Sequence, residues 1–523
     1  MKKYMLKAVL WGSVITTSGQ EPFGKLYGDG VGGFRKDLIE LSSGNVVTDI
    51  SRGTGISLMD LNGNVIETNH FWADSILPLR SIQQRAMNEF NFISGRVSVC
   101  ASSPSGLGTF PVIGVIDSIG HVQSMRSYEL AGPGCFYATG SLEVTANKSV
   151  IACGYETSFF AMKVDSIGEP IWGKSFTNNG GFQFIRELPS GDLIAGINMD
   201  TAGAVVARLD ALGNFLWCKS YIRPNGIIND VIIESDSSFI ITGYTDSIDN
   251  DLPIPPEFNA KLFMMKLNGT GEVQWCRGYV SNHSWRTIHS SKIVWATDNN
   301  YVLLATIRTQ LGMRPFLMKT DQNGDTLWTR STGVTNYSYG TSSLMASSTG
   351  GYYFNGNIAG NLPGNYSSLP FLIKTASDGS MPCSAQWYPI GIEDLFPVDS
   401  SFTLTSSDGL EARPLSFQDT TLTPFSTYDA CLITSVRPQY VNKYKPRIYP
   451  NPNTGRFTVD FVDPLRADSF YSVYDSMGKL LYQRPLPSGA TTEEVDLARF
   501  GRGIYLLKIT DPEGVRTERV VVE

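Results

Sequence analysis

Aspartate, or in one copy asparagine, recurs in this chain at a fixed distance before glycine and tryptophan. The clearest copies are AMKVDSIGEPIW (161–172), VARLDALGNFLW (206–217), MMKLNGTGEVQW (264–275) and LMKTDQNGDTLW (317–328). Calcium binding requires clustered oxygen ligands, and one carboxylate per copy does not supply them. The sialidase Asp-box, Ser-x-Asp-x-Gly-x-x-Trp, has a serine and shorter spacings. We therefore interpret Asp-x-x-Gly as a turn, in which the carboxylate accepts backbone N–H groups and glycine adopts positive φ. The tryptophan that follows is expected to pack between neighbouring repeats.

Other catalytic signatures are missing from the sequence. It contains no G-x-S-x-G, no H-E-x-x-H, no phosphate loop and no G-x-G-x-x-G after a strand. A carbohydrate-active enzyme would need two carboxylates brought together in space, and the loop acids Asp246, Asp249 and Asp251 are the candidates. No catalytic residue is assigned.

The seven cysteines and four histidines show no zinc-ligand spacing, so neither a metal nor a cofactor is predicted. Cys383 and Cys431 bracket the segment after the last repeat and are a candidate disulfide in an oxidising compartment. Cys100 and Cys153 lie in equivalent strands, as do Cys218 and Cys276, and all four are interpreted as small buried apolar residues.

The turn and the strand before it, together called the marker, occur seven times, about 53 residues apart on average. The weaker copies begin near 57, 114 and 373. A second alternating strand precedes most copies, as in SVIACG and FIITGY. Four short strands per repeat of this length are typical of a β-propeller blade. The sequence predicts an all-β chain with a seven-bladed β-propeller over 20–383, with six or eight blades as alternatives.

The ends of the ring are predicted to exchange a strand. FGKLYGDGVGGFR (23–35) echoes WGKSFTNNGGFQ (172–183), which completes one repeat and opens the next. No repeat precedes the first of these stretches, so it is expected to pair with strands around 352–383 and remove the exposed sheet edges. Two segments interrupt the pattern: a proline-rich surface loop at 251–256 and an extra hairpin at 384–436, packed on the propeller.

After a linker at 437–446, residues 447–523 contain short alternating strands that indicate a small sandwich. Four features occur in order: YPNP (449–452), VYDxxGK (473–479), DLxxxxxGIY (496–505) and a terminal apolar strand. Their key residues are Pro450, Asn451, Pro452, Gly478, Lys479, Gly503 and Tyr505. This segment resembles the type A C-terminal sorting domain of the type IX secretion system. The resemblance implies an immunoglobulin-like fold, export through the outer membrane, and partnership with the type IX machinery.

The other end of the chain and its charge agree with export. Residues 1–19 combine a basic start, a short apolar run and small residues, as a secretory signal peptide does. No other stretch is apolar enough to span a membrane. The whole chain has a net charge of −7. Residues 20–440 carry −11, because the first 19 residues contribute +3 and the last 83 contribute +1. That acidity disfavours nucleic acid as a partner.

We therefore expect a secreted protein, either released or anchored to the outer cell surface. The favoured hypothesis is a non-catalytic binding or adhesion module for a glycan or a surface protein. The alternatives are a carbohydrate-active hydrolase or lyase and a structural component of a surface layer.

Overall fold

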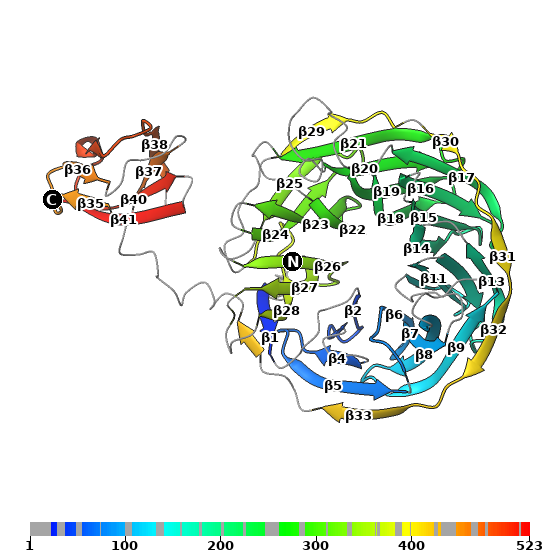
Figure 1. Ribbon diagram of the computed structural model, residues 1–523. Helices are drawn as coiled ribbons and strands as arrows, with labels where there is room; N and C mark the ends of the chain where they lie inside the picture. The colour runs from blue at the N-terminus through cyan, green and yellow to red at the C-terminus, as the bar shows by residue number, and fades with distance from the viewer. Residues whose placement is uncertain are drawn as a thin grey trace, which may run out of the picture. The chain divides into compact units, whose positions relative to one another are not determined.

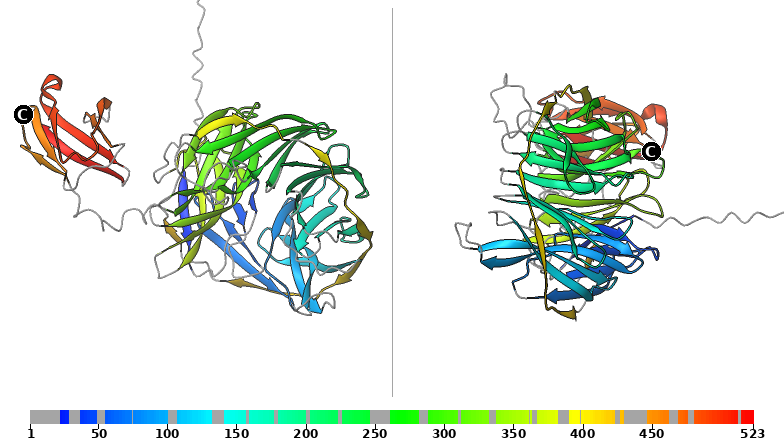
Figure 2. Two further views of the ribbon diagram at one scale, coloured as in Figure 1. Left: turned by 45° about the horizontal axis from the view of Figure 1, so that its top comes forward. Right: turned by 90° about the vertical axis from the view of Figure 1, so that its right-hand side faces the viewer.

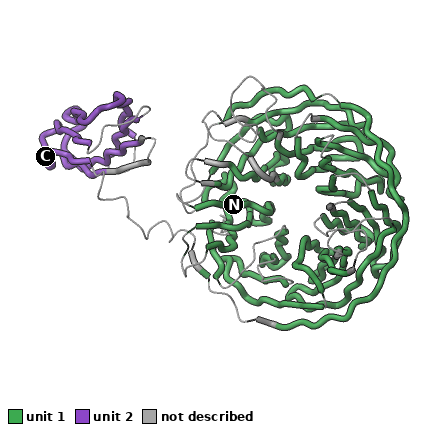
Figure 3. The backbone as a smooth tube through the Cα atoms, in the orientation of Figure 1, with its two compact units in different colours: residues 1–434 green, residues 435–523 purple. Residues whose placement is uncertain are grey.

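The computed structural model describes residues 22–523 apart from 22 short segments. These are 29–36, 49–54, 74, 100–106, 132–140, 157–158, 177–179, 200–202, 223–225, 246–260, 282–287, 310–311, 332–336, 361, 363–366, 382–389, 398, 423–426, 430–445, 462–468, 476–479 and 512–513. The predicted signal peptide and the proline-rich loop lie outside the described residues. The chain divides into two compact units, residues 1–434 and 435–523 (Figure 3).

Unit 1 is built from seven groups of four antiparallel strands placed around a central axis (Figure 1). The innermost strands are β2 (Leu38–Glu40), β6 (Ser81–Ala86), β10 (Leu142–Val144), β14 (Gly180–Glu187), β18 (Ile227–Ser235), β22 (Ile288–Trp295) and β26 (Ser338–Ala346). The second strands are β3 (Val46–Thr48), β7 (Glu89–Val99), β11 (Val150–Glu156), β15 (Leu193–Met199), β19 (Ser238–Thr245), β23 (Tyr301–Thr309) and β27 (Tyr352–Ala359).

The outer half of each group has the same antiparallel order. The third strands are β4 (Gly55–Met59), β8 (Leu107–Asp117), β12 (Phe159–Val164), β16 (Gly203–Leu209), β20 (Lys261–Asn268), β24 (Gly312–Thr320) and β28 (Ser368–Lys374). The fourth strands are β5 (Val65–Trp72), β9 (Val122–Leu130), β13 (Pro170–Phe176), β17 (Phe215–Ile222), β21 (Val273–Ser281), β25 (Thr326–Ser331) and, for the last group, β1 (Phe23–Tyr27). We number the groups 1 to 7 by their innermost strands. The expectation of an all-β, propeller-like fold is confirmed.

Apolar seams between neighbouring groups form the core of unit 1. One cluster joins Phe159 and Phe176 of group 3 to Phe182 of group 4, and comparable clusters fill every other seam, including that between groups 7 and 1. Since each sheet is covered on both faces, its middle strands are continuous apolar runs. All six residues of β12, FFAMKV, are buried.

The predicted exchange of ends is confirmed. β1 pairs antiparallel with β28, with Lys25 opposite Leu372, so a strand from the start of the chain completes group 7. This pairing makes the seam between groups 7 and 1, where Tyr27, Leu38 and Tyr353 are buried together.

The described part of the segment predicted as an extra hairpin at 384–436 lies against the ring but forms no hairpin. Residues 390–397, 399–422 and 427–429, which we call the belt, follow the outside of the ring and add one short strand to six of the groups (Figure 1). Its strands are β29 (Ile390–Asp394), β30 (Ser400–Ser401), β31 (Ser406–Asp408), β32 (Leu410–Pro414), β33 (Gln418–Leu422) and β34 (Thr427–Asp429). They pair in turn with β21, β17, β13, β9, β5 and β1. The belt pairs with the fourth strands rather than folding back on itself, because the free N–H and C=O groups of a fourth strand are already aligned for pairing. Figure 2 shows the belt from two further sides.

Unit 2 consists of two antiparallel sheets around one core. The first sheet contains β35 (Arg447–Tyr449), β36 (Arg456–Asp460) and β39 (Thr492–Asp496), and the second contains β37 (Phe470–Tyr474), β38 (Leu480–Pro485), β40 (Gly503–Asp511) and β41 (Gly514–Val522). Phe457 and Val495 of the first sheet pack with Val473 and Leu507 of the second. Among the described residues the only helix is the 3-10 turn η4 (Ala498–Phe500).

Candidate functional site

The repeated acidic residues close turns at the ends of the third strands. Asp210 Oδ1 accepts the backbone N–H groups of Leu212 (2.9 Å) and Asn214 (2.8 Å), and Gly213 adopts φ 77°. The same pair of hydrogen bonds is made by Asp60, Asp117, Asp165, Asn268 and Asp321. The turn interpretation is confirmed, and no group has more than one marker carboxylate, because the marker position is Asn268 in group 5 and Ala376 in group 7.

The tryptophan after each turn joins its group to the next, as predicted. Trp172 Nε1 donates to Ala211 O (3.0 Å), and Trp217 Nε1 donates to Gly269 O (3.0 Å). A Cβ on Gly213 would lie 3.0 Å from the Trp172 ring, so glycine also makes room for the indole.

A second interlocking residue was not predicted. Four tyrosines on fourth strands donate their hydroxyls to the glycine carbonyl of the next turn: Tyr27 to Gly63 (2.8 Å), Tyr128 to Gly168 (2.9 Å), Tyr221 to Gly271 (2.5 Å) and Tyr279 to Gly324 (2.7 Å). They follow the tryptophan position by four residues, as in WCKSY and WCRGY. That spacing was the signal that could have revealed them.

Three of the cysteines interpreted as apolar, Cys153, Cys218 and Cys276, are buried. Burial raises the pKa of the Cys218 and Cys276 thiols to about 12. Such thiols are inert at neutral pH. Cys100 and the candidate pair Cys383 and Cys431 lie outside the described residues, so the disulfide stays a prediction.

The innermost strands bring polar residues to the axis of the ring. In groups 4 to 7 each innermost strand carries an extra residue in its pairing with the second strand, at Gln183, Asn229, Ser290 and Ser342, and β18 carries a second at Glu234. A β-bulge of this kind redirects the side chains beside it.

Hydrogen bonds near the axis link each group to the next around the whole ring. The acceptors and donors are Asp37 Oδ2 and Ser81 Oγ (2.5 Å), Gln83 Oε1 and Val144 N (2.8 Å), Ser141 Oγ and Arg186 Nη1 (2.6 Å), Asn198 Oδ1 and Ile228 N (2.8 Å), Asp230 Oδ2 and Ile293 N (3.3 Å), Thr306 Oγ1 and Thr341 N (3.1 Å), and Thr48 Oγ1 and Asn355 Nδ2 (3.1 Å). Polar groups near the axis therefore connect neighbouring groups and help to close the ring.

The link through Arg186 is accompanied by an ion pair. Arg186 Nε lies 3.4 Å from Glu143 Oε2 across the seam between groups 3 and 4. Burial raises the pKa of Glu143, although Arg186 acts to lower it. Burial acts to lower the pKa of Arg186, but Glu143 and Asp230 raise it above its ordinary value. The guanidinium is therefore held charged by its partners and is unsuited to proton transfer.

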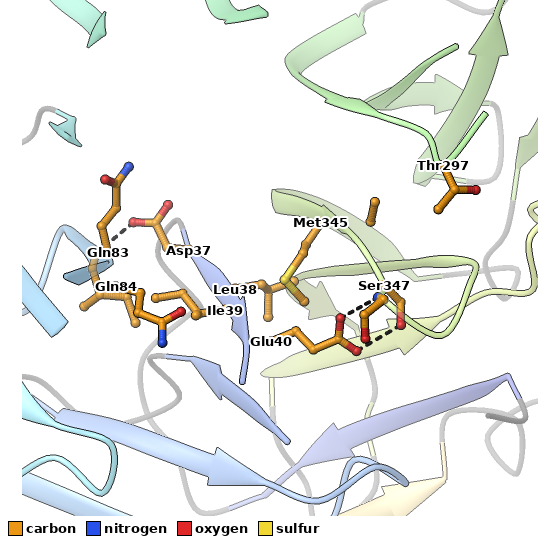
Figure 4. A pocket seen from close by; sticks show the side chains of 12 residues that line it. Asp37, Leu38, Ile39, Glu40, Gln83, Gln84, Thr297, Met345 and Ser347 are labelled. Carbon is orange, nitrogen blue, oxygen red and sulfur yellow. Dashed lines mark hydrogen bonds between the residues drawn. The ribbon is translucent and has the colours of Figure 1, made fainter. Parts of the chain in front are cut away.

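A pocket of about 640 Å³ opens at the inner edges of groups 1, 2, 6 and 7 (Figure 4). Its lining contains two carboxylates, two amides, hydroxyls and aliphatic side chains: Asp37, Leu38, Ile39, Glu40, Ile82, Gln83, Gln84, Thr297, Met345, Ala346, Ser347 and Ser348. We call it the axial pocket. It carries no lysine or arginine.

Both carboxylates of the axial pocket already have donors. Glu40 accepts Ser347 Oγ (3.0 Å) and Ser348 N (2.6 Å), and Asp37 accepts Ser81 Oγ and the backbone N–H of Ile82 (2.8 Å). Carboxylates fixed in this way position neighbouring strands. The arrangement suits recognition of a ligand better than transfer of a proton.

Groups of three or more His, Cys, Asp or Glu side chains able to hold a metal ion are absent from the part of the chain that is described. The loop acids Asp246, Asp249 and Asp251 lie outside the described residues.

In unit 2 the predicted motif residues tie the opening of the unit to its last strand. Asn451 donates Nδ2 to Arg519 O (2.8 Å) and accepts Val521 N (2.9 Å). Pro450 and Pro452 flank Asn451, and Gly503 begins β40 opposite Val522. Tyr505 is buried and its hydroxyl contacts Phe500 O (2.8 Å) and Gly501 O (2.9 Å). Gly478 and Lys479 lie outside the described residues.

The family of this unit is decided by comparison. Residues 447–523 match the family of secretion system C-terminal sorting domains. This segment is a type IX sorting domain. The sorting domain implies the secretion machinery as a partner, and the protein is therefore exported to the cell exterior. Among the described residues no helix is long and apolar enough to cross a membrane.

The chain is similar to several solved structures at low sequence identity and low TM-score. They include a protein of unknown function from Bacteroides caccae (12% identity, 54% of this chain and 90% of that chain, TM-score 0.33) and a polysaccharide lyase (9%, 65% and 89%, TM-score 0.38). A GH43 β-1,3-galactosidase is also similar (9%, 92% and 82%, TM-score 0.26). A comparison with curated proteins finds no match. At these scores the likenesses carry no argument about activity.

Proposed function

We propose that unit 1 is a seven-bladed β-propeller that serves outside the cell as a non-catalytic binding or adhesion module for a glycan or a surface protein. Residues 1–19 would direct the chain to the general export pathway, and the sorting domain, with an immunoglobulin-like fold, would carry it across the outer membrane.

One observation carries the binding role. The axial pocket is open and lined by polar and aliphatic side chains, and its two carboxylates are held by donors from neighbouring strands. A glycosidase needs an acid and a second carboxylate facing one bond. Hydroxyl and amide groups over aliphatic walls instead provide the hydrogen bonds and apolar surface that a neutral ligand requires.

The test screens the mature chain against arrays of glycans and surface proteins and, in parallel, for cleavage of the same polysaccharides. We expect binding without turnover. Gln84→Arg would place a long cation at the exposed edge of the axial pocket and should weaken binding at least tenfold. Gln322→Arg is the matched control, because Gln322 is exposed on the turn between β24 and β25.

Turnover of a polysaccharide would replace this proposal with the alternative, a carbohydrate-active hydrolase or lyase. Binding that Gln84→Arg leaves intact would move the site away from the axial pocket. Deletion of 447–523 should separately leave the protein inside the cell envelope, and its appearance in the medium would contradict the export route.

A further inference from the structure

Most fourth strands carry a lysine or arginine at an equivalent position, and the belt pairs with several of them. Two residues after the tryptophan position every fourth strand except that of group 1 carries lysine or arginine: Lys25, Arg126, Lys174, Lys219, Arg277 and Arg330. Because side chains alternate along a strand, this position falls on the same face of each fourth strand. The outside of the ring therefore offers a row of similarly placed cations.

The belt brings an acid to four of these six cations. The exceptions are Arg126, which faces Pro414 of the belt and pairs with Glu169 of the neighbouring group, and Arg330, whose strand pairs with no described belt strand. Asp408 lies directly opposite Lys174 in the pairing of β31 with β13, and Oδ1 is 2.8 Å from Nζ. Asp394 stands opposite Arg277 and forms an ion pair with it, and Asp429 stands opposite Lys25. Opposite charges on directly facing residues of neighbouring strands stabilise the pairing.

Apolar belt residues enter the seams between groups. Leu404 is buried in the seam between groups 3 and 4, and Leu410 packs in the seam between groups 2 and 3. Leu395 and Leu415 pack against the clusters on either side of these. Their backbone N–H groups donate to fourth-strand carbonyls, Leu395 to Cys276 O (2.9 Å) and Leu415 to Met125 O (3.0 Å). The belt thus alternates an edge pairing with an apolar anchor.

The belt is nevertheless a thin addition. Its strands are two to five residues long, and the side chain of Asp408 is 72% exposed whereas that of Lys174 is 8% exposed. Six acceptor edges are complete without the belt, since each group has its own four strands and seams. The acceptor edges therefore do not depend on the belt, whereas the belt could be replaced by another strand.

We infer that the circumference of the ring is an acceptor surface for acidic extended strands, filled by the chain's own belt, and that the belt of a second copy can fill it in trans. Two bare rings would not pair edge to edge in the same way, because a cation on one edge would face a cation on the other. Charge complementarity selects the belt as the partner.

Gly409 offers a way to release the belt locally. It adopts φ 146°, its N–H donates to Gly173 O (2.9 Å), and an added Cβ would lie 2.7 Å from the Ala131 Cβ. Gly409→Val should therefore displace β31 and β32 while leaving the acceptor strands β13 and β9 unchanged. Lys174→Glu does the reverse, because it repels Asp408 and leaves the belt sequence intact.

The experiment uses full chains and a labelled peptide of residues 404–422. We expect the peptide to bind Gly409→Val at least tenfold more tightly than wild type, and the peptide with Asp408→Lys to bind it at least tenfold more weakly. Mixing Gly409→Val with Lys174→Glu should give a heterodimer in sedimentation, since one variant supplies the acceptor and the other the belt. Each variant alone should sediment as a monomer.

Limited proteolysis of the belt shows whether it has been released, and Ser416→Val in the same segment is the control for a change of side chain alone. Release of the belt with neither peptide binding nor heterodimer would overturn the proposal. So would continued protection of the belt in both variants, because Gly409 and the Lys174 pair would then not hold it. Should Gly409→Val fail to fold, preference of Lys174→Glu for the Asp408→Lys peptide over the native peptide decides the question.

Discussion

At the scale of single residues, the marker acids act on their own turns. Each carboxylate satisfies two backbone N–H groups that the tight turn would otherwise leave to water, and Asn214 adds a side-chain bond to Asp210 Oδ2 (2.9 Å). Burial acts to raise the pKa of Asp210, but the hydrogen bonds from Asn214 and Leu212 hold it below its ordinary value. The same direction holds for Asp378 in group 7, where bonds from Ser380 lower the pKa.

Asp210→Ala is expected to lower the free energy of unfolding by about 1 kcal/mol, because two turn N–H groups lose their acceptor. The carboxylate is the stabilising form, since its folded pKa lies below the unfolded value of ~3.9. Its contribution is present above that value and is lost as the pH falls through the lower folded pKa. Urea unfolding of both proteins at pH 7 and near pH 2.5 measures this, and an equal difference at both pH values would contradict the role.

At the scale of elements, a group is held to its neighbour by a repeated set of contacts at the seam. The tryptophan covers the next turn, the tyrosine hydroxyl binds that turn's glycine carbonyl, and aliphatic side chains fill the space between. Group 3 has Phe176 where groups 4 and 5 have Tyr221 and Tyr279. The ring therefore accommodates this position without the hydroxyl, which allows its hydrogen bond to be tested by itself.

Tyr221→Phe and Tyr279→Phe should each cost about 1 kcal/mol of unfolding free energy, the net value of one hydrogen bond whose acceptor stays buried. The two hydroxyls lie in different seams, so the double variant should cost the sum to within ~0.5 kcal/mol. Chemical denaturation of the three variants gives these numbers. Single variants as stable as wild type would show that Gly271 O and Gly324 O are not stabilised by the hydroxyls.

At the scale of the whole molecule, three segments far apart in the chain meet in one sheet. β1, β28 and β34 lie side by side, so the first strand is enclosed between the end of the last repeat and the end of the belt. Leu26 on β1 is fully buried in the seam between groups 6 and 7. Ring closure therefore depends on a strand of five residues.

Leu26→Ala is expected to cost about 3 kcal/mol, the usual range for a fully buried leucine. Leu216→Ala, at a residue that is 55% exposed on a fourth strand, should cost less than ~0.5 kcal/mol. Denaturant midpoints of the two variants give the comparison. Equal effects would mean that β1 does not contribute to the stability of the closed ring.

The sequence by itself determined the repeated unit, the role of its turn and the sorting domain, because all three depend on spacings within a few residues. Asp-x-x-Gly followed by Trp predicts a turn and an inter-group contact wherever it occurs. The exchange of ends was predictable for the same reason, since 23–35 repeats an internal pattern.

The belt and the axial pocket were decided only by the tertiary structure. Belt strands of two to five residues pair with partners more than a hundred residues away, so no local period reveals them. The axial pocket joins residues 37–40, 82–84 and 345–348, which come together because the ring closes. Their carboxylates look free in the sequence and are engaged in the fold, since a neighbouring strand supplies donors that linear spacing does not encode.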